Sequence, residues 1–100
     1  MEIKICGLTC QADIQSAIAL GATALGLVFY PPSKRYVEVN RAQQLRQYIP
    51  KQIKCVALVM NETAENIQHI IAKIQPDVLQ FHGDLSHETP DFCAQFGVPY

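Results

Sequence analysis

The chain has 100 residues, which is enough for one small domain with its own hydrophobic core. Its hydrophobic fraction of 49% and charged fraction of 17% exclude a disordered chain. Its net charge of -1 gives no general attraction to nucleic acid or to an anionic membrane. The longest apolar run, residues 24–30, is too short to span a bilayer, so we expect neither a nucleic-acid nor a membrane partner.

Five short runs rich in β-forming residues follow one another along the chain, beginning about 20 to 30 residues apart. They occupy residues 2–6 (EIKIC), 24–30 (ALGLVFY), 53–60 (IKCVALVM), 77–81 (DVLQF) and 98–100 (VPY). Each interval leaves room for one helix and two short loops. The runs predict five strands, the last of them reaching the end of the chain.

The first two intervals carry helical patterns. Ile14, Ala17 and Ile18 share one helical face, with Thr9 expected as the N-cap and Gly21 as the stop. The second helix is expected from about Val39, through an apolar face, to Pro50.

The next two helices have clearer boundaries. An isoleucine stripe at residues 67, 70, 71 and 74 follows a predicted Thr63 cap and ends before Pro76. In the last, Thr89-Pro90 is typical of an N-cap and first helical residue, and Gly97 marks the end.

The alternation of strands and helices predicts an α/β fold with parallel strands and right-handed crossovers. The runs 24–29 and 55–60 are almost continuously apolar, as parallel strands covered on both faces should be. Two architectures fit this pattern, an open doubly wound sheet and a piece of a (β/α)8 barrel. A closed barrel takes about 200 residues or more, so this chain supplies only about half of one.

In both architectures, ligands bind at the carboxyl ends of the strands and the loops that follow. Those positions hold Cys6-Gly7, residues 30–35 (YPPSKR), Asn61 and residues 82–84 (HGD). We expect the four strand ends to gather on one rim.

Cys6 is a candidate nucleophile or proton acceptor, because a thiolate at a strand end faces the ligand. The alternative is a buried structural cysteine. Arg35 presents a planar guanidinium suited to a carboxylate or phosphate, and its alternative is a solvated loop charge. His82 suits proton transfer or an oxyanion, and its alternative is a strand-end cap.

Several other site types are not indicated. There is no glycine-rich phosphate loop and no C-x-x-C pair, and the three histidines are too scattered to indicate a metal site. Met1 leads directly into the first strand with no secretory signal, so we expect reduced cysteines and a cytoplasmic protein.

Four motifs, in order along the chain, resemble one enzyme family. KICGLT at the first strand end, GATALGLVFYP at the second, SKRYV in the loop after it and VLQFHGD at the fourth are similar to phosphoribosylanthranilate isomerase. This family is a TIM barrel, (β/α)8, of tryptophan biosynthesis. The resemblance implies an aldose-ketose isomerase, an intramolecular oxidoreductase by class. It converts N-(5'-phosphoribosyl)anthranilate, an aminoaldose, into an aminoketose by an Amadori rearrangement.

The resemblance also implies roles for three residues and a small-molecule phosphosugar-anthranilate substrate. Cys6 corresponds to the general base, Arg35 to the arginine that contacts the anthranilate end, and His82 to a histidine in the pocket. No metal or organic cofactor is implied. The family's general acid follows strand 5 and its phosphate site follows strands 7 and 8, both beyond Tyr100.

We therefore expect residues 1–100 to be the amino-terminal half of a single TIM-barrel domain, with no further domain boundary and no activity on its own. An alternative is a non-catalytic half-barrel that assembles with another chain. In either case the exposed barrel interior and free strand edges are expected to favour self-association.

Overall fold

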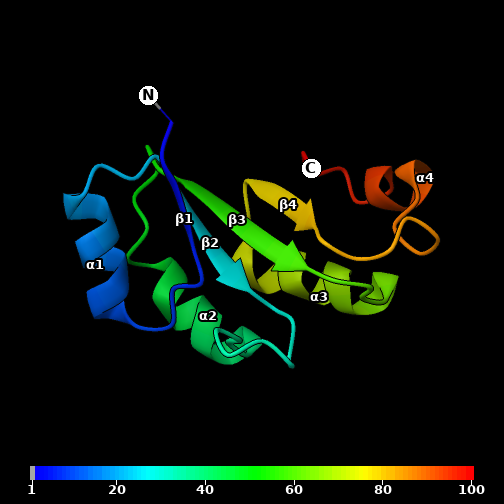
Figure 1. Ribbon diagram of the computed structural model, residues 1–100, viewed down its shortest axis with the longest axis horizontal. Helices are drawn as coiled ribbons and strands as arrows, with labels where there is room; N and C mark the ends of the chain where they lie inside the picture. The colour runs from blue at the N-terminus through cyan, green and yellow to red at the C-terminus, as the bar shows by residue number, and fades with distance from the viewer. Residues whose placement is uncertain (1) are drawn as a thin grey trace.

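The computed structural model describes residues 2–100, in which four strands alternate with four helices (Figure 1). This alternation confirms the predicted α/β class. The elements are β1 (Lys4–Cys6), α1 (Gln11–Ala19), β2 (Ala24–Val28), α2 (Val39–Arg46), β3 (Lys54–Val59), α3 (Ala64–Ile74), β4 (Val78–Phe81) and α4 (Pro90–Ala94).

The four strands form one sheet in the order β1-β2-β3-β4, and all three pairings are parallel. The parallel pairing predicted from the sequence is therefore confirmed. Spatial order follows chain order without a reversal. Residues that pair in register point to the same face, so Cys6, Gly26, Val56 and Val78 form one row across the sheet.

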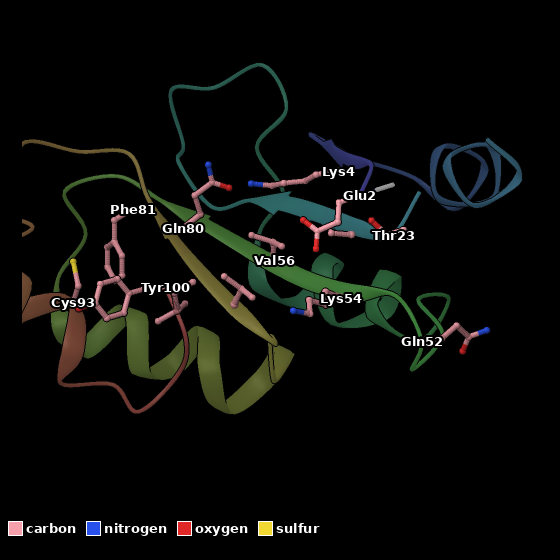
Figure 2. A pocket seen from close by; sticks show the side chains of 13 residues that line it. Glu2, Lys4, Thr23, Gln52, Lys54, Val56, Gln80, Phe81, Cys93 and Tyr100 are labelled. Atoms are coloured by element: carbon pink, nitrogen blue, oxygen red, sulfur yellow. The ribbon is translucent and has the colours of Figure 1, made fainter. Parts of the chain in front are cut away.

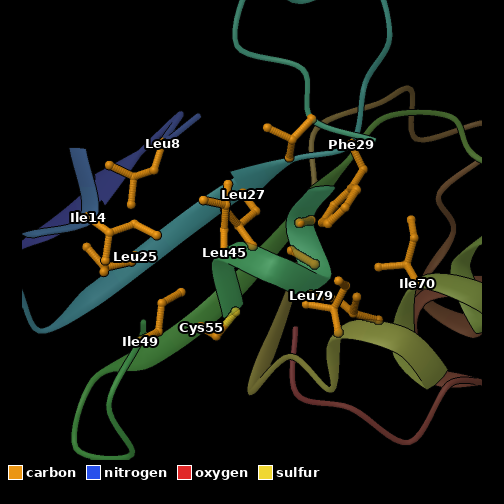
Figure 3. Close-up of a cluster of buried hydrophobic side chains, with 14 of the residues drawn as sticks. Leu8, Ile14, Leu25, Leu27, Phe29, Leu45, Ile49, Cys55, Ile70 and Leu79 are labelled. Atoms are coloured by element: carbon orange, nitrogen blue, oxygen red, sulfur yellow. The ribbon is translucent and has the colours of Figure 1, made fainter. Parts of the chain in front are cut away.

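Helices α1, α2 and α3 lie along the same side of the sheet, with α1 at the left and α2 and α3 below the strands in Figure 1, and α4 lies beyond the carboxyl end of β4. The hydrophobic core fills the space between this side of the sheet and the helices (Figure 3). Alternate residues of the strands supply one half of the core and the helix stripes supply the other. Its fully buried large side chains include Ile14, Leu25, Leu27, Leu45, Ile67, Ile70, Ile74 and Leu79.

The opposite side of the sheet, called the inner face below, carries no helix. Lys4 and Lys54 project from it and are exposed, whereas Val56 is buried (Figure 2). None of the helices in residues 2–100 has the length and apolar character needed to cross a membrane.

Two of the three predicted threonine caps are present. The Thr63 hydroxyl oxygen accepts from the Asn66 N–H and the Thr89 hydroxyl oxygen accepts from the Phe92 N–H. The Thr9 prediction was wrong, because Cys10 occupies the N-cap of α1.

The reason for the late start of α1 is that the chain is still attached to the sheet after β1. The N–H groups of Gly7 and Leu8 both donate to the Gly26 carbonyl oxygen. Thr9 instead donates from its N–H and its hydroxyl to Asp13 Oδ2, at 3.4 and 3.3 Å.

The end of the chain also differs from expectation. Residues 98–100 do not form a strand, although the Leu79 N–H of β4 donates to the Pro99 carbonyl oxygen at 2.7 Å. Pro99 has no N–H of its own and cannot extend a ladder. The segment therefore lies at the edge of β4 with a single strand-like bond.

The second helix is also shorter than predicted, since residues 47–49 form turns after Arg46.

Candidate functional site

The candidate site is the rim formed by the carboxyl ends of the four parallel strands. Cys6 ends β1, and the loop that carries Arg35 leaves β2. Asn61 follows β3, and His82 follows β4. The parallel sheet therefore brings the predicted strand ends to one edge, as expected.

Cys6 lies half-buried on the inner face, in register with Gly26 of the neighbouring strand. A Cβ atom placed on Gly26 would lie 2.8 Å from Cys6 Sγ, which is closer than real side chains approach. Because Gly26 has no side chain, the Cys6 sulfur can lie directly over β2.

Arg35 crosses Gly7, the residue that follows Cys6. A Cβ atom placed on Gly7 would overlap Arg35 Cδ, and Gly7 has a φ of +85°, which only glycine adopts without strain. The loop is held close to the sheet because the Val37 N–H donates to the Val28 carbonyl oxygen at 3.0 Å. Arg35 itself is exposed, and its N–H donates to Ser33 Oγ at 3.1 Å.

A shallow hollow of about 430 Å³ lies where these residues meet. Cys6, Gly7, Lys34 and Arg35 line it together with residues of α1. Cys6 and two cationic side chains thus line one open space, to which Asp13 of α1 adds a carboxylate.

His82 lies at the same rim, with β2 and β3 between its strand and that of Cys6. Its N–H donates to the Val59 carbonyl oxygen at 2.9 Å, and its ring is exposed. Gln80 Nε2 lies 2.5 Å from His82 Nε2. Which group donates in this contact depends on the His82 tautomer and on the orientation of the Gln80 carboxamide.

A buried glutamate at this rim was missed from the sequence. Glu88 accepts hydrogen bonds from the Asn61 N–H, at 3.0 Å, and from the Gly83 N–H. Asn61 Oδ1 in turn accepts from the Asp84 N–H at 2.7 Å. The loops after β3 and β4 are therefore joined, and no sequence pattern near Glu88 indicated this role.

The inner face itself is hollowed. A space of about 670 Å³ runs across it and reaches the edge of β4, with Lys4, Lys54, Val56, Gln80 and Tyr100 among its lining residues (Figure 2). Figure 2 shows Lys4 and Gln80 extending toward one another over the sheet. Gln80 Oε1 is buried and has no hydrogen-bond partner among residues 2–100.

Two of the other cysteines, Cys55 and Cys93, are buried. Burial raises the pKa of Cys55 to about 11, with Arg46 opposing and Asp77 adding to the shift. Burial, and then the Glu88 carboxylate, also raise the pKa of Cys93. Both thiols are therefore poor nucleophiles at neutral pH. All four cysteines are free, and no group of three possible metal ligands occurs within residues 2–100.

Comparison with known proteins identifies one family. The model of the family described as "PRAI: N-(5'phosphoribosyl)anthranilate (PRA) isomerase" matches residues 3–99. The N-(5'-phosphoribosyl)anthranilate isomerase of Bordetella pertussis is 48% identical over 99 residues, covering 99% of this chain and 44% of the relative. The enzyme of the same name from Neisseria meningitidis is 44% identical over 100 residues, covering all of this chain and 47% of the relative.

Solved structures agree. Phosphoribosyl anthranilate isomerase from Thermotoga maritima superposes with a TM-score of 0.89 at 32% identity, covering 97% of this chain and 46% of that one. A complex of such an isomerase with reduced 1-(o-carboxyphenylamino)-1-deoxyribulose 5-phosphate superposes with a TM-score of 0.88, also at 32% identity, covering 97% of this chain and 48% of that one. The chain spans about half the length of the relatives it matches.

Proposed function

Because the chain belongs to the N-(5'-phosphoribosyl)anthranilate isomerase family, we propose that it forms the amino-terminal half of a (β/α)8 barrel that catalyses this reaction of tryptophan biosynthesis. The sequential strand order, with helices α1 to α3 on one side, supports a barrel over a doubly wound sheet, whose strand order reverses. The half-length match to the relatives supports the half-barrel.

The open inner face gives further support. It becomes the barrel interior once further strands cover it, and such strands would supply a donor for the unpartnered Gln80 Oε1. The bond from Leu79 N–H to Pro99 is where a parallel fifth strand would begin. Residues 1–100 would then be part of a single domain, with no boundary within them.

The proposed reaction is an aldose-ketose isomerisation, driven by proton transfer alone. Once the ribose ring of the substrate has opened to an iminium ion, the C2' proton is acidic because the C=N⁺ bond accepts the electron pair. Cys6 as thiolate takes that proton, and the resulting enolamine tautomerises to the aminoketose. Only an acid and a base are required, so the proposal includes no metal or organic cofactor.

The observation that carries this proposal is the crossing of Arg35 over Gly7, beside Cys6. The guanidinium would bind the anthranilate carboxylate, and the sugar carbon bonded to the anthranilate nitrogen would then lie near the Cys6 sulfur. His82, whose ring is exposed at the other side of the rim, would donate a hydrogen bond to a substrate oxygen.

The chain on its own is proposed to be inactive. None of the three candidates serves as the ring-opening acid, and no phosphate site is built among them. The exposed inner face and the edge of β4 would also make the isolated chain self-associate.

The same face favours a second candidate function, a non-catalytic half-barrel that assembles with another chain. The four free thiols support a cytoplasmic location, where cysteines remain reduced.

A fluorescence assay of the anthranilate group tests the proposal. The purified chain is assayed alone and mixed with a separately expressed carboxyl-terminal half of a relative such as the Bordetella pertussis enzyme. We expect no turnover from either half alone and measurable turnover from the mixture. Turnover by the chain alone would refute the proposed inactivity. A folded complex of the two halves without turnover would favour the non-catalytic half-barrel.

A further inference from the structure

The rim contains one buried charge that no catalytic role accounts for. Glu88 is 6% exposed and is the only charged side chain that is buried among residues 2–100. The single ion pair in that part of the chain joins Arg46 and Asp77, so no cation neutralises Glu88. A buried carboxylate without a cation needs strong hydrogen bonds. The groups that donate those bonds are therefore the parts of the chain that Glu88 holds in place.

Its two donors come from two different loops. Glu88 Oε2 accepts from the Asn61 N–H in the loop after β3, at 3.0 Å. Glu88 Oε1 accepts from the Gly83 N–H in the loop after β4. Each carboxylate oxygen thus has one backbone donor, and the two loops are tied together through one side chain.

The loops are also packed against one another at this point. A Cβ atom on Gly83 would overlap the Asn61 side chain, and Asn61 itself has a φ of 51°. The Asp84 N–H donates to Asn61 Oδ1 at 2.7 Å, which adds a bond between the same loops. Capping of α4 does not require Glu88, because the Thr89 hydroxyl already performs it.

These bonds fix the backbone on both sides of His82. The His82 N–H donates to the Val59 carbonyl oxygen at 2.9 Å, and the next N–H along the chain, that of Gly83, donates to Glu88. We propose that Glu88 is a positioning residue, which holds His82 at the rim by fixing the peptide that follows it. The importance of this role for catalysis rests on the proposed isomerase function.

Nuclear magnetic resonance of the 100-residue chain tests the proposal without any substrate. In the unaltered chain, we expect slow hydrogen exchange at the Asn61 and Gly83 amides and scalar couplings from both across the hydrogen bonds to the Glu88 carboxylate. Absence of both couplings would overturn the proposal even if no variant folds.

The Glu88→Gln variant then separates positioning from simple stabilisation. It replaces one accepting oxygen with an NH2 group, so exchange at Asn61 or Gly83 should accelerate by ~tenfold or more. The His82 ring signals should shift and its side-chain order should fall, while those of His69, exposed on α3, stay constant. The control Glu65→Gln makes the same charge change on an exposed residue and should alter neither loop.

Unchanged His82 signals in a folded Glu88→Gln protein would overturn the positioning role and leave Glu88 purely structural. Glu88→Asp, which keeps the charge but shortens the side chain, is expected to retain one of the two bonds and to give an intermediate His82 response. Because these measurements concern only this chain, a negative isomerase assay would count against the proposed function and not against the Glu88 contacts.

Discussion

The Arg35 side chain lies directly across Gly7, the residue after Cys6, and leaves no room there for a side chain. This relationship connects two loops that are far apart in the sequence. The turn out of β1 needs a positive φ at Gly7, and the loop after β2 uses the space that glycine leaves. The candidate base and the candidate carboxylate-binding group are neighbours for that reason.

Gly7→Ala should therefore do two things. An alanine in the left-handed region costs about 1–2 kcal/mol of stability, and its Cβ would also displace Arg35. Gly21→Ala is a matched control, because Gly21 has a φ of +90° but no atom within 4 Å of the place that an alanine Cβ would take. Urea unfolding should show a loss in both variants, whereas the Arg35 Nε–H resonance should move only in Gly7→Ala. A resonance unmoved in both would contradict the crossing.

Cys6→Ser tests the proposed base in the assembled two-half enzyme. Serine keeps the size and hydrogen bonding of cysteine, but its hydroxyl does not ionise near neutral pH. Loss of a positioned base typically lowers kcat by about 10² to 10⁴-fold. Cys10→Ser, at the N-cap of α1, is the control and should retain turnover. A folded Cys6→Ser enzyme within about threefold of the unaltered one would remove Cys6 from the mechanism.

Arg35→Ala should affect ligand affinity more than folding, because the side chain is exposed. A charge-assisted hydrogen bond contributes roughly 1.5–3 kcal/mol, so KM should rise by about one to two decades. Lys34→Ala removes the neighbouring charge and should change KM much less, since an ammonium cannot bind a carboxylate in the same forked geometry. Equal effects of the two changes would indicate a general attraction of anions instead of a specific contact.

The fold was largely predictable because its signals are local and repeated. The isoleucine stripe of α3 and the Thr63 and Thr89 caps each involve residues within a few positions of one another. The prediction of Thr9 as an N-cap failed because hydrogen bonds from Gly7 and Leu8 to Gly26 delay the start of α1. These are tertiary contacts, which a local sequence pattern does not contain. Glu88 was missed for a similar reason. Its burial depends on Asn61, 27 positions away in the sequence, so nothing near Glu88 marks it as buried.

Stability at alkaline pH should depend on Cys55. Burial raises the pKa of this thiol to about 11 in the folded chain, from the 9.0 typical of a solvated thiol. Below pH 9 both states hold the proton and stability is unaffected. Between pH 9 and 11 the unfolded chain releases the proton first, so stability falls, by roughly 2–3 kcal/mol for two pKa units. Urea unfolding at pH 7, 9 and 10.5 should show a loss for the unaltered chain that is smaller in Cys55→Ala. Parallel losses in the two proteins would assign the effect to other groups, such as tyrosines and lysines.

The isolated chain should self-associate through its inner face and the edge of β4. This side of the sheet has no helix over it, and its apolar side chains gain by excluding water when a second sheet covers them. Light scattering over a range of concentrations should show a mass above that of the monomer.

Val78→Lys places a charge in the row that contains Cys6 and Val56, and should shift the distribution toward monomer. Leu85→Lys adds the same charge at a site that is 86% exposed in the loop after β4, and should leave the mass unchanged. A monomer at every concentration, with cooperative unfolding, would mean that this four-stranded sheet is stable with its inner face in water. A mixture with the carboxyl-terminal half should instead form a complex of one copy of each, because both inner faces are then covered at once.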